Sequence, residues 1–305
     1  MVSLNIKLDR GTLAGFAAIV LWSTTVALIR SLSERVGPIT AGVAVYAVGG
    51  IFCIVQLLRS KTPRYQIRNL PSSYLLGCGG LFILYMLVIY LGIGLANDRH
   101  QVLQVGLLNY LWSALTILFS LFLLKNKGRF PLIPGTLLAL VGAFLVLTEG
   151  SGISWPSFAR NVASNPVVYV LGLTAAISWA LYSNLTRLWG EKATSSGVLL
   201  FIPATAIVLL LVRLSIIESG AWSLAAGLEA AFLGLATALA YLFWDIAMRK
   251  GNLVLVAAFS YFIPLFSTLL SSLYLHVTPE LSLWLGCVFI VIGSLMSWKG
   301  VSSPK

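Results

Sequence analysis

Long apolar runs alternate with short polar or charged stretches from the beginning of the chain to its end. A helix needs about 20 mostly apolar residues to cross the hydrocarbon core of a bilayer. Breaking the chain at its charged and Pro/Gly-rich stretches gives ten such segments, of which the fifth is short. The ten segments are Thr12–Arg30, Pro38–Leu58, Ser73–Ala96, Gln101–Leu124, Pro134–Thr148, Val167–Leu188, Gly197–Leu214, Ser223–Ala247, Leu253–Leu275 and Leu281–Trp298. The pattern predicts an all-α membrane protein with ten transmembrane helices.

Composition supports a surface that faces lipid. The chain has 305 residues, of which 59% are hydrophobic and 10% charged, and its mean hydropathy is +0.95. A soluble domain carries about 25% charged residues, because its surface must suit water. Cys53, Cys78 and Cys287 all lie inside apolar runs, so they indicate no disulfide framework. Lys7 and Arg10 precede the first run as in a secretory signal, but the later runs favour a first span that stays in place.

Basic residues alternate between the loops of the ten predicted spans. If the N-terminus is inside, fifteen of the 20 Lys and Arg residues fall in cytoplasmic segments and five in outer segments. The five outer residues are Arg30, Arg35, Arg99, Arg160 and Arg213. This bias is the one that orients inner-membrane proteins. We therefore expect a multi-pass protein of the cell inner (plasma) membrane with both termini cytoplasmic, and the net charge of +11 requires no nucleic acid partner.

The first and sixth spans share residues in a fixed register. At an offset of 157 residues, Gly15–Glu34 lies over Gly172–Glu191, and Trp22/Trp179, Arg30/Arg187 and Glu34/Glu191 are identical. This repeat predicts two five-helix domains, residues 1–150 and 165–300. Because five is odd, the second half enters the membrane from the opposite side. Inverted repeats of this kind are typical of transporters, with the substrate site near the midplane around a central cavity.

Ten spans, a five-plus-five repeat and the Gly…Trp…Arg…Glu opening of each half resemble the drug/metabolite transporter superfamily, of the EamA type. In the fourth span, Ala96–Leu118 and its NYLW core from Asn109 to Trp112 resemble the YddG-type aromatic amino acid exporters. Family helices often have a proline after this core, where this chain has Ser113; the repeat partner in the ninth span has Pro264. The resemblance implies export of amino acids, aromatic ones among them, through a central cavity.

Polar and aromatic side chains inside the spans are candidates to line a path, because lipid surrounds the protein. Helical spacing groups several of them into stripes. The candidate cavity residues are Trp22, Tyr85, Tyr90, Gln101, Asn109, Trp112, Thr116, Trp179, Tyr182, Tyr241, Trp244, Ser260, Tyr261 and Pro264. Tyr85 and Tyr90 are five residues apart, so we expect at most one to point inward. Packing between the halves explains Trp22 and Trp179 equally well, and in-span hydroxyls often only bond their own helix.

An aromatic-lined cavity suits an aromatic or aliphatic side chain through stacking and apolar burial. A ring face could also hold a substrate ammonium, which contributes about 0.5–2 kcal/mol. Asn109, Gln101, Tyr241 and Tyr261 are the available donors to a substrate carboxylate. The predicted partners are therefore small amino acids and membrane lipid, the cavity needs no cofactor or metal, and we expect a functional monomer.

Energy coupling and rival functions remain open at this level. The only carboxylates within the spans, Glu229 and Asp245, lie near opposite ends of the eighth. No relay of ionisable residues is visible, which favours facilitated export (uniport) by alternating access. The alternatives are proton-coupled export of other small metabolites or drugs, and a channel. An enzyme is disfavoured, because the chain has no HExxH, GxSxG or P-loop motif.

Overall fold

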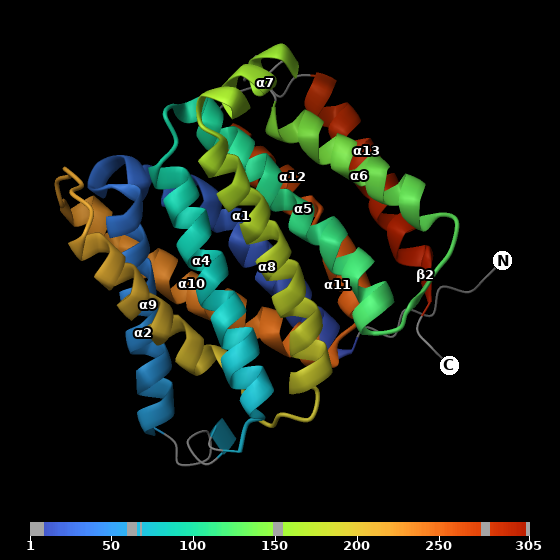
Figure 1. The fold of residues 1–305 in the computed structure, drawn as a ribbon, viewed down its shortest axis with the longest axis horizontal. Helices are drawn as coiled ribbons and strands as arrows, with labels where there is room; N and C mark the ends of the chain where they lie inside the picture. Colours follow the sequence, from blue (N-terminus) through green and yellow to red (C-terminus); the bar gives the residue numbers. More distant parts are fainter. Residues whose placement is uncertain (1–8, 60–65, 68, 149–154, 276–280, 303–305) are drawn as a thin grey trace.

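A computed structural model describes residues 9–59, 66–67, 69–148, 155–275 and 281–302. Figure 1 shows that the helices form a bundle. The helices in these ranges are α1 (Arg10–Val36), α2 (Pro38–Arg59), the π-helix η1 (Ser73–Cys78), α4 (Gly79–Gly94), α5 (Arg99–Leu123), α6 (Leu132–Leu147), α7 (Trp155–Ser164), α8 (Pro166–Gly190), α9 (Val198–Leu214), α10 (Leu224–Lys250), α11 (Leu253–Phe259), α12 (Phe262–Leu275) and α13 (Leu281–Lys299). Strand β1 (Lys127–Gly128) pairs antiparallel with β2 (Val301–Ser302).

Each predicted segment falls on helical structure, and two segments contain more than one helix. The third segment comprises η1 and α4, and the ninth comprises α11 and α12. By length and composition, five helical stretches in the described ranges can cross a membrane. They are Pro38–Arg59, Ser73–Gly94, Gln104–Leu123, Pro166–Gly190 and Leu224–Lys250. The architecture is therefore mostly helical, with several apolar helices of membrane-spanning length.

Polar residues at the helix starts explain where several helices begin. Asp9, Asp98, Ser223 and Asn252 precede α1, α5, α10 and α11, and each side chain accepts a hydrogen bond from the backbone N–H three residues later. Such caps satisfy amide groups that have no partner inside the helix. The short side chains that interrupt the apolar pattern thus also fix the helix boundaries.

Helices α1 and α10 run in opposite directions across the bundle. We call the end at which α1 begins and α10 ends the basal end, and the opposite end the distal end. At the basal end the Asn252 N–H donates to the Thr12 hydroxyl, and at the distal end the Ala221 N–H donates to the Arg35 carbonyl. Helix α8 ends at the basal end, where Gly190 lies against Arg249 and Tyr74. Helices α1 and α8, which carry the matching sequence, therefore run in opposite directions.

Helices of the first half pack mainly on helices of the second. Helix α1 packs on α10, α4 and α5 on α8, α2 on α9, and α6 on α13. Small residues allow the closest of these contacts: a methyl group at Gly142 would lie 2.7 Å from the Gly286 carbonyl oxygen, and one at Gly135 would lie 2.9 Å from that of Gly293. Glycines at such positions let helix backbones meet, which is the usual way helices associate in lipid.

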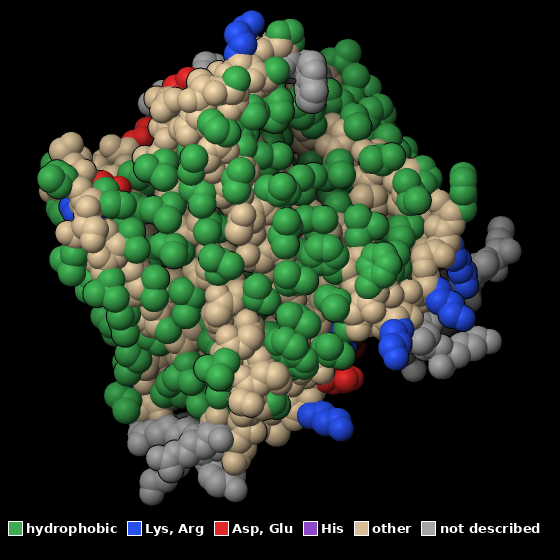
Figure 2. Space-filling view, in the orientation of Figure 1, with side chains coloured by type: hydrophobic (Ala, Val, Ile, Leu, Met, Phe, Trp, Pro, Cys, Tyr) green, Lys and Arg blue, Asp and Glu red, His purple; other side chains and the backbone are tan. Residues whose placement is uncertain are grey.

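The surface has the character expected of a membrane protein. On the face in Figure 2, charged side chains lie along the margins, and hydrophobic side chains cover much of the middle. Large apolar residues such as Phe122, Leu211 and Val288 are exposed. In water an apolar surface of this extent would cause association. An apolar surface of this kind is suited to contact with lipid hydrocarbon.

Pro264 explains the interruption between α11 and α12. A proline has no N–H, so it cannot donate to the carbonyl four residues earlier, which here belongs to Ser260. The helix breaks at Ser260 and Tyr261, and the Ile263 N–H donates to the Ser260 carbonyl instead. Helix α5, which has Ser113 where the family often has proline, is continuous from Arg99 to Leu123. The interruption at Pro264 therefore has no counterpart at Ser113.

One helix was not predicted from the sequence. Helix α7 has only ten residues and contains Arg160 and Asn161, so it does not resemble a span. It covers the distal end between the two halves, at the top of Figure 1. Phe158 packs edge-on against Tyr169 of α8 with ring centroids 5.7 Å apart, which anchors the helix to the bundle.

Candidate functional site

A group of aromatic side chains occupies the centre of the bundle, with Trp179 of α8 at its middle. The Trp179 side chain is only 2% exposed. Its ring contacts seven others, with centroid separations from 4.8 to 6.3 Å: Trp22, Phe82, Tyr85, Trp112, Tyr182, Tyr241 and Trp244. We call these eight residues, together with Tyr46, the aromatic cluster. Edge-to-face and offset ring pairs each contribute about 0.5–1.5 kcal/mol beyond the burial of their area.

Six helices supply the cluster, so its shape depends on how the two halves meet. Its members come from α1, α2, α4 and α5 of the first half and from α8 and α10 of the second. Tyr241 and Trp244 lie three residues apart on α10, and both rings contact Trp22 of α1, at 5.4 and 5.2 Å. Residues at this spacing share one helix face. A relative movement of α1 and α10 would therefore rearrange the centre of the cluster.

Few polar groups accompany the rings. The Trp244 indole N–H donates to the Ser183 hydroxyl at 3.2 Å, and the Tyr46 hydroxyl donates to that of Tyr241 at 3.2 Å. The Asn109 amide donates to the Tyr85 hydroxyl at 3.4 Å, while the Asn109 Oδ1 atom is buried without a partner among the residues the structure describes. An amide oxygen in this position is able to accept a hydrogen bond from a substrate.

Most of the predicted cavity residues belong to this cluster or touch it. Trp22, Tyr85, Trp112, Trp179, Tyr182, Tyr241 and Trp244 are members, and Asn109 bonds Tyr85. Tyr85 contacts Trp179 directly, whereas Tyr90 contacts Tyr46, with ring centroids 6.2 Å apart. Tyr90 therefore lies outside the cluster and contacts it through Tyr46.

The other predicted residues lie elsewhere or face their own helix. Gln101 bonds Asn161 and Ser164 under α7, at the distal end. The Thr116 hydroxyl donates to the Trp112 carbonyl of its own helix, and Ser260 bonds Ser113 at 2.7 Å. Gln101, Ser260, Tyr261 and Pro264 have no hydrogen bond or ring contact with the cluster in the described part of the chain. As cavity residues they therefore gain no support from this geometry.

Three residues at the site were missed by the sequence analysis: Tyr46, Phe82 and Ser183. Tyr46 is the one polar aromatic residue of its span, a signal comparable to that of Tyr241. Phe82 gave no signal, because one phenylalanine in an apolar span looks like any lipid-facing residue. Ser183 looks like an ordinary in-span hydroxyl, and its Oγ also donates to the Trp179 carbonyl.

Charged side chains at the distal end join the two halves. The Glu218 carboxylate accepts hydrogen bonds from the backbone N–H groups of Ile39 and Thr40, both at 2.8 Å, and lies 3.5 Å from Arg213. It therefore caps α2 from another part of the chain. Glu229 of α10 accepts a hydrogen bond from Ser31 of α1 and lies 3.9 Å from Arg35.

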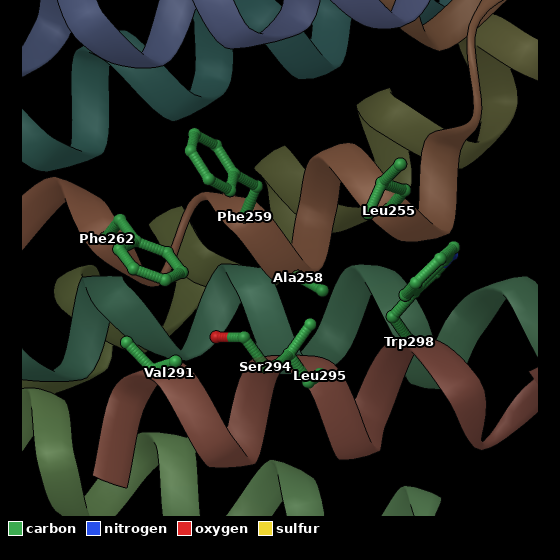
Figure 3. Close-up of a pocket in the computed structure, with 8 residues that line it drawn as sticks. All are labelled: Leu255, Ala258, Phe259, Phe262, Val291, Ser294, Leu295 and Trp298. Carbon is green, nitrogen blue, oxygen red and sulfur yellow. The ribbon is translucent and has the colours of Figure 1, made fainter. Parts of the chain in front are cut away.

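A pocket lies away from the cluster, between α11, α12 and α13. Its volume is about 120 Å³, and Figure 3 shows the eight side chains that line it. Seven of them are apolar, and Ser294 is the one polar side chain among them. The pocket therefore lacks groups that could bind both the ammonium and the carboxylate of an amino acid. Among the described residues there is also no group of three His, Cys, Asp or Glu side chains that could hold a metal ion.

Comparison with known proteins decides the family. The model of the EamA-like transporter family matches twice, over residues 9–148 and 167–298. The chain belongs to the EamA-like transporter family. This family consists of transporters, so the chain is a membrane transporter and not an enzyme.

Relatives of this EamA-like transporter include several with a described cargo. It is 34% identical to the aromatic amino acid exporter YddG of Salmonella typhimurium over 95% of this chain and 97% of that protein. It is 33% identical to YddG of Escherichia coli over the same shares, and 30% identical to YddG of Ancylobacter novellus over 94% and 96%. A solved crystal structure of a protein 28% identical has the same fold, with a TM-score of 0.81 over 95% of this chain and 97% of that one.

Proposed function

We propose that this EamA-like transporter exports aromatic and other neutral amino acids through the aromatic cluster. The observation that carries the proposal is the cluster itself, because an aromatic substrate ring can replace ring–ring contacts that Trp179 already makes. Because the substrate ring would replace ring–ring contacts of a similar kind, the net free energy of binding stays small. Weak binding suits a carrier that must release its substrate. The relatives named as aromatic amino acid exporters point to the same substrate class.

The proposed mechanism is alternating access between two inverted five-helix halves, residues 1–150 and 165–300. Two separate matches to one family model and the opposite directions of α1 and α8 support this repeat. The packing also supports a two-fold relation: α1 on α10 corresponds to α8 on α4, and α2 on α9 and α6 on α13 pair equivalent helices. Ten spans, an inner-membrane location and cytoplasmic termini complete the proposal, and the loop charges favour that orientation.

Transport is proposed to be uncoupled from protons, in a functional monomer. Asp245 is the most deeply buried carboxylate among the described residues, and an arginine neutralises it at 2.8 Å. Because Arg249 already occupies this carboxylate, Asp245 is a poor candidate for the free ionisable group that proton carriers place in a span. Flux of L-phenylalanine in proteoliposomes with and without a pH gradient tests this. A strong dependence on the gradient that is lost in Asp245→Asn would establish proton coupling instead.

A pair of matched tryptophan variants tests the site. We expect Trp179→Ala to reduce flux of L-phenylalanine and L-tryptophan in proteoliposomes at least about tenfold, because seven ring contacts are lost. Trp284→Ala is the control, since that side chain is 54% exposed on the surface of α13. Thermal unfolding of both variants in detergent separates loss of the site from loss of the fold. Equal flux in the two variants would show that the aromatic cluster is not the substrate site. Absence of flux of any amino acid by the native protein would contradict the proposed function.

A further inference from the structure

A buried ion pair lies at the basal end of α10, one helical turn from the cluster. Asp245 Oδ2 is 2.8 Å from the Arg249 Nε atom, and the two side chains are 0% and 5% exposed. The residues are four positions apart, so both lie on the helix face that contains Tyr241. Asp245 follows directly after Trp244, a member of the aromatic cluster.

Both halves of the protein hold the pair in place. The Tyr74 hydroxyl of the π-helix η1 donates to Asp245 Oδ1, and the Gly197 N–H donates to the Tyr74 oxygen at 3.0 Å. Arg249 Nη1 donates to the Ala193 carbonyl at 2.8 Å. The pair thereby joins α10 to η1 and to the segment between α8 and α9. Short π-helices occur often at functional sites.

Structural need does not explain a charged pair in this position. Taking both charges out of water is costly, and apolar side chains of similar volume in their place are usually neutral or stabilising. Charged groups buried between transporter helices commonly belong to the substrate path. Asp245 and Arg249 are the one fully enclosed pair of opposite charges in the part of the chain that the structure describes.

A continuous series of rings leads from the pair to the aromatic cluster. Tyr74 contacts Phe201 at 5.9 Å, Phe201 contacts Phe82 at 5.9 Å, and Phe82 contacts Tyr241 at 5.0 Å. An aromatic side chain could therefore keep ring contacts all the way from the basal end to the centre. The charged ends of the same molecule would need partners at the start of that path.

We propose that Asp245 and Arg249 form the binding site for the zwitterionic backbone of an amino acid that enters from the basal end. The substrate ammonium takes the place of Arg249 on Asp245, and the substrate carboxylate takes the place of Asp245 on Arg249. The inference rests on the proposed function and adds the group that selects for a zwitterion. An amine or an acid supplies one charge only and leaves the other member of the pair buried and unpaired, which is strongly unfavourable.

Competition by compounds that share one ring and differ in charge tests the inference. Flux of labelled L-phenylalanine by the purified native protein in proteoliposomes is measured against unlabelled L-phenylalanine, L-phenylalaninamide, which lacks the carboxylate, and N-acetyl-L-phenylalanine, which lacks the ammonium. We expect both analogues to compete at least about tenfold more weakly than L-phenylalanine, because each loses a hydrogen bond between charged groups. Equal competition by all three compounds would overturn the inference, while the proposed function would stand.

The double variant Asp245→Asn/Arg249→Gln locates that selectivity. It removes both charges together, so it leaves no unpaired charge behind. We expect its half-maximal L-phenylalanine concentration to rise at least about tenfold and the preference over both analogues to disappear. The matched control is Arg213→Gln/Glu218→Gln at the distal end, which should keep the preference even where it changes the rate.

Retention of native selectivity by the Asp245/Arg249 double variant would show that the pair only closes the basal end, and would overturn the inference. Thermal unfolding and gel filtration in detergent report whether the variant folds. The competition measured on native protein decides the question of zwitterion selection without any variant. Absence of L-phenylalanine flux in native protein would instead remove the proposed function.

Discussion

At the basal end the side chains of Asp245 and Arg249 are 0% and 5% exposed, whereas at the distal end those of Arg35 and Glu229 are 47% and 16% exposed. Both pairs join α10 to its surroundings, but their physical consequences differ. Charges exposed to water are screened and interact weakly, while charges in a dry interior interact strongly and are costly to separate. Opening the basal end therefore requires replacement partners for two charges, and opening the distal end does not.

Removing one charge from the basal pair should have the largest effect on stability. We expect Asp245→Asn to destabilise the protein by about 3–5 kcal/mol, because Arg249 is left as an uncompensated buried charge. Thermal unfolding in detergent measures this, and Arg249→Gln in the same background should recover much of the loss. A single variant as stable as the native protein would mean that water reaches the basal end and that the two ends are alike.

The distal cap on α2 should have an intermediate effect. Glu218→Gln keeps the shape of the side chain but offers one acceptor oxygen to Ile39 and Thr40 in place of two. We expect a loss of about 1–2 kcal/mol, in the range of helix caps, measured by the same unfolding experiment. Ser219→Ala, at an exposed neighbouring position, is the control and should be close to neutral. A loss as large as that of Asp245→Asn would contradict the contrast between the ends.

The exposed distal pair should have the smallest effect. Arg35→Gln removes a partner that lies 3.9 Å from Glu229 and leaves Ser31 bonded to that carboxylate. We expect a change below about 1 kcal/mol, which disappears as salt is raised from 0.05 to about 0.5 M because the pair is screened. Unfolding of native protein and variant at the two salt concentrations makes the comparison. A salt-independent difference would mean that this pair is buried as well.

Hydropathy predicted the helices well because lipid imposes a simple requirement on each span. The helices found at Pro38–Arg59 and Leu224–Lys250 lie within a few residues of the predicted bounds. Aromatic residues in polar stripes, such as Trp112 and Trp244, were predicted to point inward, and their rings do meet in the interior, 5.3 Å apart. Their spacing fixes a helix face, and the interior is the one place where such a face is useful.

Sequence spacing predicts which face of a helix a residue lies on, but not which residues of other helices surround it at that level of the bundle. Gln101 shares a face with Trp112 but lies eleven residues away, so it reaches the distal end and bonds Ser164. Asp245 was placed near the end of its span, yet η1 and the segment after α8 cover it completely. In both cases, contacts with residues distant in the sequence determine the surroundings of the side chain. Helix α7 was missed for a related reason, because a short helix is stabilised by what it covers rather than by its own pattern.

The contact between α6 and α13 makes this helix pair an internal reference for spectroscopic distance measurements. The two backbones meet closely at two places, where Gly142 lies against Gly286 and where Gly293 lies against Gly135. Sliding one helix along the other would press backbone atoms together at both places. The strands β1 and β2 join the chain segments at the basal ends of the same two helices. Labels on α6 and α13 should therefore keep one separation through the transport cycle, and movements of α1 or α10 can be measured against it.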